Sequence, residues 1–175
     1  MEIIPTDIPD VCIIKPIIYA DDRGYFFESY NHDVFLASAL DLNFIQDNES
    51  RSMKGVLRGL HFQQKPSAQG KLVRVMRGAV LDVAVDIRKY SPTYGKYVSI
   101  VLTGDNKYMY WIPEGFAHGF LTLEDDTVFF YKCTNLYDKA SEGSIRWNDP
   151  DLNIDWGMDS PILSEKDKIS PLFKD

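Results

Sequence analysis

The chain contains 175 residues, of which 45% are hydrophobic and 26% are charged, and its formal net charge at pH 7 is -7. This composition is typical of a folded globular protein and excludes an intrinsically disordered chain. The acidic balance argues against a nucleic-acid-binding surface, which needs a basic stripe that displaces counterions from phosphates. A small anionic ligand is still compatible with it, because a few arginines and lysines in one cleft are enough to bind such a ligand.

The length and the two cysteines predict a single domain in a reducing compartment. A chain of this size buries a hydrophobic core without disulfides, so we expect residues 1–175 to form one domain. Cys12 and Cys133 form no Cys-x-x-Cys pair and indicate no disulfide framework. Pro5 and Pro9 interrupt the first residues, which lack the apolar run of a signal peptide, and no later run is long enough to span a membrane. We therefore expect a cytoplasmic protein that binds neither membranes nor nucleic acid.

Most of the chain has the apolar alternation of short β-strands separated by Gly, Pro, Asn or Asp. Only the segment 32–41 has a convincing helical pattern, with Asn31 as its N-cap and Asp33 in its first turn. In chain order, the predicted strands are 11–18, 24–30, 43–47, 55–63, 71–77, 79–87, 97–103, 107–112, 117–123 and 127–134. So many short strands predict a mainly β fold, namely a double-sheet sandwich, a jelly roll or a small barrel, whose interior can hold a ligand.

The strand predicted over 79–87 contains two acids in a largely apolar segment. Val83 and Val85 share one face of this strand, whereas Asp82 and Asp86 lie on the other. Two alternatives are open. Either Asp82 is buried and orients a residue of a binding site, or both acids face solvent on the far side of the sheet. We include neither acid among the catalytic residues.

The three histidines differ in their sequence context. His32 lies at the start of the predicted helix, where an exposed polar residue without a role is the simplest interpretation. His61 lies in VLRGLHFQ, where apolar neighbours and Arg58 favour a neutral imidazole that can accept a proton, although a histidine of the core fits equally well. His118 lies in WIPEGFAHGF, whose glycines indicate a tight turn close to a bound ligand or a turn that the histidine itself caps.

The sequence indicates neither a metal site nor a cofactor site. It has no His-x-His pair, and the carboxylates that would complete a metal site around His61 and His118 cannot be assigned. The glycine-rich motifs of dinucleotide and nucleotide binding and the Gly-x-Ser-x-Gly motif of hydrolases are also missing. The remaining interpretation is acid–base chemistry by side chains alone.

Several segments resemble one enzyme family, in the order and at the spacing of that family. They are, in chain order, DDRGYFFESYN, FIQDNES, VLRGLHFQ, QGKLVRVMRG, DVAVDIR, WIPEGFAHGF, YKCTNLYDKASEGSIRWNDP and LSEKD. Over nearly the whole chain they are similar to the dTDP-4-dehydrorhamnose 3,5-epimerases, which catalyse the third step of dTDP-rhamnose synthesis. The resemblance implies a cupin-like jelly roll, a homodimer without a metal or another cofactor, and dTDP-4-dehydro-6-deoxyglucose as the substrate.

The resemblance also implies a set of site residues. The family's catalytic base matches His61, the aspartate paired with it matches Asp167, and the family's acid matches Tyr131. We expect Lys71 or another donor to stabilise enolate charge, and Tyr137 matches the residue that stacks on thymine. The other substrate-contacting positions match Arg23, Glu28, Gln46, Asp47, Asn48, Arg58, Lys71, His118, Glu142 and Lys166. Family members place their first strands against the partner subunit, which would put Arg23 and Glu28 in the neighbour's site.

One geometric conflict affects this set. In an unbroken strand, Arg58 and His61 have opposite parity and would point to opposite faces of the sheet. Gly59 offers a solution, because a glycine tolerates a bulge that redirects one of the two side chains.

Two alternative functions are open from the sequence. A relative that inverts a single carbon, or isomerises a related keto-sugar, would have the same motifs. A non-catalytic module that binds nucleotide sugars would retain the arginines, the lysines and Tyr137, and the presence of both His61 and Tyr131 counts against it.

Overall fold

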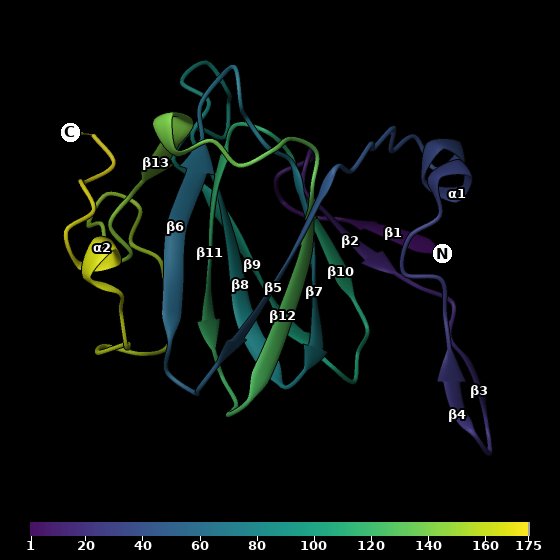
Figure 1. Ribbon diagram of the computed structural model, residues 1–175. Helices are drawn as coiled ribbons and strands as arrows, with labels where there is room; N and C mark the ends of the chain where they lie inside the picture. Colours follow the sequence, from purple (N-terminus) through teal and green to yellow (C-terminus); the bar gives the residue numbers. More distant parts are fainter. Residues whose placement is uncertain (175) are drawn as a thin grey trace.

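The structure is a computed structural model that describes residues 1–174. Its strands form two antiparallel sheets that face each other, and a separate hairpin (Figure 1). The six-stranded sheet has the order β1 (Glu2–Pro5), β2 (Cys12–Lys15), β10 (Met109–Ile112), β7 (Lys71–Arg77), β12 (Thr127–Cys133) and β5 (Gln46–Ser52). The five-stranded sheet has the order β13 (Glu142–Ser144), β6 (Leu57–Gln63), β11 (Phe116–Thr122), β8 (Ala79–Asp86) and β9 (Tyr97–Thr103). This arrangement is a double-sheet jelly roll, so the predicted fold class is confirmed.

The main hydrophobic core lies between the two sheets. Val73, Tyr110 and Phe129 of the six-stranded sheet pack there against Val80 and Phe120 of the five-stranded sheet. The strands that line this core, β7 to β12 among them, contribute alternate side chains to it, because successive residues of a strand point to opposite faces. Segments outside the sheets cover the two outer faces, so each sheet buries apolar residues on both sides.

The predicted helix begins where the sequence indicates and ends early. α1 spans His32–Ala37, and the Asn31 side chain accepts a hydrogen bond from the backbone N–H of Val34, as an N-cap does. The helix stops because Ala39 adopts a positive φ of 62°, which a right-handed helix cannot contain. Phe35 is buried against the outer face of the six-stranded sheet, whereas His32 is exposed to solvent, as the sequence predicts.

One predicted strand is wrong in position. The strand expected over 43–47 lies at Gln46–Ser52 instead, a segment of entirely polar sequence. Alternate residues of β5 are exposed, and the others, among them Gln46 and Asn48, face a polar cavity rather than the apolar core. Apolar alternation therefore gives no signal there.

Several short elements were not predicted. They are β1, β13, the first strand of the hairpin, the 3₁₀ turn Lys139–Ser141 and a single helical turn, α2 (Glu165–Lys168). None of the helices within residues 1–174 is long and apolar enough to cross a membrane.

The hairpin formed by β3 (Tyr19–Asp21) and β4 (Gly24–Phe26) extends away from the two sheets (Figure 1). Its aromatic side chains are exposed, with Tyr19 at 63%, Tyr25 at 59% and Phe26 at 66% of their full accessible area. A cluster of exposed aromatic residues of this kind marks a surface that contacts another molecule.

Asp86 holds the loop between β8 and β9. Its side chain is fully buried, and the alternative that both acids of β8 face solvent is therefore wrong. The carboxylate accepts hydrogen bonds from the Arg88 guanidinium at 2.8 and 2.9 Å, from Ser91 Oγ at 2.5 Å and from Thr93 Oγ1 at 2.6 Å. Burial raises the pKa of Asp86, but these hydrogen bonds lower it by more, so the net pKa lies well below its ordinary value.

Asp86→Asn should lower the free energy of unfolding at pH 7 by about 2–4 kcal/mol, because it leaves buried donors without their charged acceptor. An aspartate whose pKa is lower in the folded state stabilises the fold above its unfolded pKa of about 3.9 and loses this effect as the pH falls. Urea unfolding of both proteins from pH 7 to pH 3 should show the difference shrinking. A difference that is constant over this range would contradict the account.

Candidate active site

Two adjoining cavities lie between the two sheets. The larger has a volume of about 560 Å³ and the smaller about 160 Å³, and both are lined by Asn48, His61, Lys71 and Tyr131. We call the two together the inner cavity. Its wall combines β5, β7 and β12 of one sheet with β6 and β11 of the other and with the segment 162–167. The jelly roll thus brings side chains from distant parts of the sequence into one polar space.

His61 and Asp167 meet across 106 residues of sequence. His61 Nε2 lies 2.6 Å from Asp167 Oδ1, and the carboxylate is almost fully buried while the imidazole is 32% exposed. An ionised carboxylate only accepts hydrogen bonds, so Nε2 carries the proton and Nδ1 is left as an acceptor. A histidine fixed in this tautomer can take a proton from a ligand in the cavity.

The helical turn α2 holds Asp167 in position. Ser164 is the N-cap of this turn, and its hydroxyl accepts from the Asp167 backbone N–H at 3.1 Å and donates to Asp167 Oδ2 at 2.8 Å. Burial raises the pKa of Asp167, but hydrogen bonds from His61 and Ser164 lower it by more, so the net pKa lies below its ordinary value. The carboxylate therefore stays ionised beside the imidazole.

Tyr131 and Lys71 lie on neighbouring strands of the opposite sheet. Val73 is the register partner of Tyr131, and Cys133 is that of Lys71, so both cavity side chains project from the inner face of that sheet. Burial raises the pKa of Tyr131, which keeps the phenol protonated and able to donate. Burial lowers the pKa of Lys71, an effect that nearby Cys133, Asp82 and Glu142 partly oppose.

Gly59 resolves the parity conflict between Arg58 and His61. It has a positive φ of 129°, and the pairing register between β6 and β11 shifts at this point, so both side chains line the same cavity. A Cβ on Gly59 would lie 2.6 Å from the Cα of Gly119 on β11, so only a glycine fits there. Arg58 is held by a hydrogen bond from its Nε to Ser52 Oγ at 3.2 Å.

A chain of polar contacts closes the smaller part of the inner cavity. Lys166 forms an ion pair with Glu142, and the Tyr137 hydroxyl donates to Glu142 Oε2 at 3.2 Å. The backbone N–H of Tyr137 in turn donates to Gln46 Oε1 at 2.8 Å. The ion pair with Lys166 lowers the pKa of Glu142. These contacts bring four of the expected substrate-contacting residues together.

His118 lies on the inner face of β11 and lines the larger cavity. Its Nε2 lies 2.9 and 3.0 Å from the two carboxylate oxygens of Asp82 on β8, which is fully buried. The first alternative for Asp82, a buried acid that orients a residue of a site, therefore fits the structure.

Four of the expected contact residues do not line the inner cavity of this chain, namely Lys166, which is linked to it only through Glu142, and three others. Arg23 sits on the projecting hairpin and pairs with Asp21, and Glu28 accepts a hydrogen bond from the Asn31 amide. Asp47 points to the outer face of β5, where it pairs with Lys132 at 2.7 Å. None of the three lines either part of the cavity.

Two supporting residues, Ser164 and Gln63, were not identified from the sequence. Ser164 precedes Asp167 with the Ser-x-x-Asp spacing of an N-terminal helix cap, and this signal was available in LSEKD. Gln63 secures the loop that carries Tyr137, since its amide donates to the Leu136 carbonyl at 3.1 Å and accepts from the Asp138 N–H at 2.7 Å. No sequence pattern indicates the role of Gln63.

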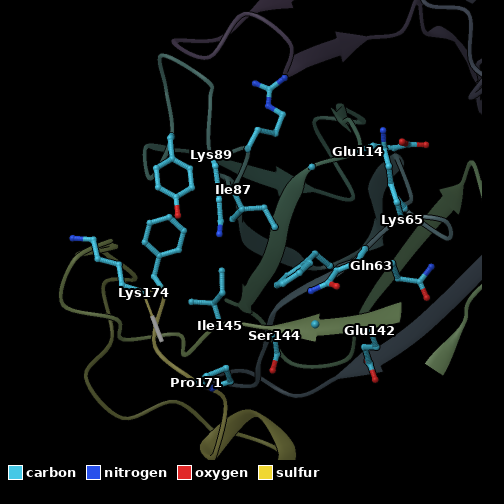
Figure 2. A pocket seen from close by; sticks show the side chains of 18 of the residues that line it. Gln63, Lys65, Ile87, Lys89, Glu114, Glu142, Ser144, Ile145, Pro171 and Lys174 are labelled. Carbon is cyan, nitrogen blue, oxygen red and sulfur yellow. The ribbon is translucent and has the colours of Figure 1, made fainter. Parts of the chain in front are cut away.

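A cleft larger than the inner cavity, with a volume of about 1310 Å³, lies beside it (Figure 2). It shares Phe62, Gln63 and Glu142 with the inner cavity, but His61 and Tyr131 do not line it. Within residues 1–174, no group of three or more His, Cys, Asp or Glu side chains is arranged to hold a metal ion.

Comparisons with known proteins identify the family of the chain. A family model described as dTDP-4-dehydrorhamnose 3,5-epimerase matches residues 5–175. The chain is 53% identical over 176 residues to the dTDP-4-dehydrorhamnose 3,5-epimerase of Shigella flexneri, and the match covers 100% of this chain and 97% of that protein.

Solved structures give the same result. A crystal structure of dTDP-6-deoxy-D-glucose-3,5-epimerase from Legionella pneumophila in complex with dTDP-4-keto-L-rhamnose is 49% identical, with a TM-score of 0.94 over 99% of this chain and 93% of that chain. A 3′-monoepimerase from Streptomyces bikiniensis in complex with dTDP-quinovose is 33% identical, with a TM-score of 0.91 over 98% and 87% of the two chains. The chain described here therefore belongs to the dTDP-4-dehydrorhamnose 3,5-epimerase family, whose members are isomerases.

Proposed function

We propose that this protein converts dTDP-4-dehydro-6-deoxy-D-glucose to dTDP-4-dehydro-L-rhamnose by inverting carbons 3 and 5 of the sugar. The observation that carries the proposal is the inner cavity, in which a His61–Asp167 pair and the protonated phenol of Tyr131 come from opposite sheets. Family membership supports the substrate.

The substrate's own chemistry explains why a base and an acid are enough. The ketone at carbon 4 acidifies the protons at carbons 3 and 5, because the carbanion that forms delocalises onto the ketone oxygen as an enolate. Inversion then requires that one group removes the proton from one face and another group returns a proton to the opposite face.

Each of these tasks has a side chain in the cavity. His61 removes the proton, and Asp167 holds its tautomer and stabilises the imidazolium that forms. Tyr131 returns a proton from the opposite sheet. Lys71, adjacent to Tyr131, donates to the ketone oxygen and stabilises the enolate, an effect worth several kcal/mol at preorganised sites. Every proton transfer is thus made by a side chain, without a cofactor.

The remaining polar residues bind the dTDP part and the sugar. Arg58 presents a guanidinium, which matches phosphate oxygens with two parallel hydrogen bonds. Tyr137 stacks on the thymine ring. The proposed contacts, taken as a set, are Arg23, Glu28, Gln46, Asp47, Asn48, Arg58, Lys71, His118, Tyr137, Glu142 and Lys166.

Similarity favours inversion at both carbons. The chain is 53% identical to a 3,5-epimerase and 33% identical to a 3′-monoepimerase, over nearly its full length in both cases. A monoepimerase and a related ketoisomerase are the remaining alternatives, because pocket shape rather than the base decides which proton is reached.

We also propose that the protein acts as a homodimer with exchange of its first strands. Arg23 is 90% exposed at the side chain and lies on the hairpin whose aromatic residues face solvent. A second copy that covers this hairpin would bury those aromatic side chains and bring Arg23 and Glu28 to the inner cavity of the neighbour. The enzyme works in the cytoplasm and supplies the 4-keto precursor of dTDP-L-rhamnose, which a separate reduction at carbon 4 completes, for cell-wall polysaccharide and lipopolysaccharide O-antigen.

Tyr131→Phe should separate proton exchange from inversion. The wild-type enzyme in deuterated water should invert both carbons and incorporate deuterium at each, as NMR of the sugar would show. In the variant, His61 still forms the enolate and returns a solvent-derived proton to the original face, so inversion should fall by about 10²-fold or more while exchange continues. Tyr110→Phe, a buried tyrosine outside the cavity, is the matched control. Equal losses of exchange and inversion would assign Tyr131 to substrate positioning instead.

Mixing two inactive variants should test the exchanged hairpin. In a hybrid dimer of Arg23→Ala and His61→Ala chains, the site with an intact His61 receives its Arg23 from the partner, and the other site has both defects. Hybrids purified through two different tags should therefore regain about half of the wild-type turnover, which each homodimer lacks. Hybrids as inactive as the two homodimers would show that Arg23 serves its own chain.

A further inference from the structure

Asp82 is an acid in the interior of the jelly roll that the proposed chemistry does not use. It is fully buried, and the contacts within residues 1–174 give its carboxylate a single hydrogen-bonding partner, Nε2 of His118. Burial of a carboxylate among apolar side chains is costly unless it is paired. An alanine or valine would fill the position without this cost, so the role of the acid lies in its hydrogen bond to His118, in addition to its charge effect on Lys71.

The two strands align these side chains. Asp82 pairs in register with Phe120 on β11, and His118 pairs with Ala84 on β8, so the acid and the imidazole are diagonal neighbours on the inner face. The imidazole packs almost parallel to the ring of Phe129, with centroids 6.1 Å apart and planes at 21°. The ring is therefore held from its face by Phe129 and from its Nε2 edge by Asp82.

We infer that Asp82 is a positioning residue that keeps the proton of His118 on Nε2 and leaves Nδ1 facing the substrate. A carboxylate accepts, so the shared hydrogen fixes Nε2 as the donor. Nδ1 makes no hydrogen bond to any residue within 1–174, and it is not among the buried side-chain atoms that lack a partner, so the cavity reaches it. Asp82 thus makes Nδ1 of His118 a hydrogen-bond acceptor for a bound sugar nucleotide.

The inner cavity then contains two histidine–aspartate pairs with different tasks. His61 is 32% exposed and its aspartate sits on the short turn α2 near the surface, an arrangement suited to a base that exchanges protons with the cavity. His118 is 8% exposed at the side chain and its aspartate lies on a central strand. The His118–Asp82 pair is therefore fixed more firmly than the His61–Asp167 pair. This is expected for a group that binds and orients the substrate and does not gain and lose a proton in each turnover.

This inference rests on the proposed function, since His118 is assigned there to substrate contact. Asp82→Asn keeps the size of the side chain and removes its charge. The variant should raise KM for dTDP-4-dehydro-6-deoxy-D-glucose about tenfold, the effect of one misdirected hydrogen bond, and change kcat by less than about twofold. Asp86→Asn is the matched control, because Asp86 is equally buried on the same face of β8 but contacts Arg88, Ser91 and Thr93. It should lower stability without changing KM.

A double-mutant cycle with His118→Ala tests whether Asp82 acts through His118. His118→Ala alone leaves a buried carboxylate without a partner and should lower Tm, and adding Asp82→Asn should raise Tm again. In that background Asp82→Asn should have no further effect on KM. Equal effects of Asp82→Asn on KM with and without His118 would overturn the inference, as would an unchanged KM in the single variant.

The tautomer can be read independently of turnover. The ¹⁵N NMR signals of the His118 ring should show a protonated Nε2 in the wild-type protein and a mixture of tautomers in Asp82→Asn. A wild-type ring with its proton on Nδ1 alone would refute the assignment. A wild-type protein that fails to turn over the sugar nucleotide but shows a protonated Nε2 would refute the proposed function and leave the positioning by Asp82 intact.

Discussion

The hydrogen bond between His61 and Asp167 is the contact on which the proposed chemistry depends. It joins a central strand to a single helical turn near the end of the chain, and neither partner is adjacent to the other in sequence. The C-terminal segment packs on the outer face of the five-stranded sheet through residues such as Ile145, Leu152 and Trp156. This packing, together with the Ser164 cap, brings a buried carboxylate to the rim of the cavity.

The jelly roll serves this contact by dividing its interior into two parts. Toward β8, β9 and β10 the space between the sheets is filled by apolar side chains, and toward β5, β6 and β12 it is open and polar. Burial acts differently on the groups in the polar part. It raises the pKa of Tyr131 and lowers that of Lys71, which suits a phenol that donates a proton and an amine close to developing negative charge.

Much of the fold follows from local sequence, and the exceptions have physical causes. Strands with an apolar inner face, such as 71–77 and 97–103, have the bounds that alternation predicts. β5 is displaced from its predicted position because its inner face lines the cavity, where polar residues replace the apolar signal. The bulge at Gly59 could be predicted from the sequence. Arg58 and His61 would point to opposite faces of an unbroken strand, so a bulge between them is required if both are to line the cavity.

The sequence likewise predicts some residues of the candidate site and not others. Family motifs locate His61, Tyr131 and Asp167, and the structure brings all three to one cavity. The role of Asp82 depends on which strand lies beside β8, which only the topology reveals. The place of Arg23 depends on a second copy of the chain, so neither the sequence pattern nor the fold of one chain determines it.

The most direct test of the central claim is the rate of deuterium exchange at carbons 3 and 5 in His61→Asn, measured together with its affinity for dTDP. The account predicts that exchange at both carbons is lost while dTDP binding, measured by calorimetry, stays close to that of the wild-type protein, because the imidazole acts on the sugar and not on the diphosphate. His32→Asn, a histidine outside the cavity, should exchange as the wild-type protein does. Exchange that persists at either carbon in His61→Asn would contradict the claim that one base removes both protons.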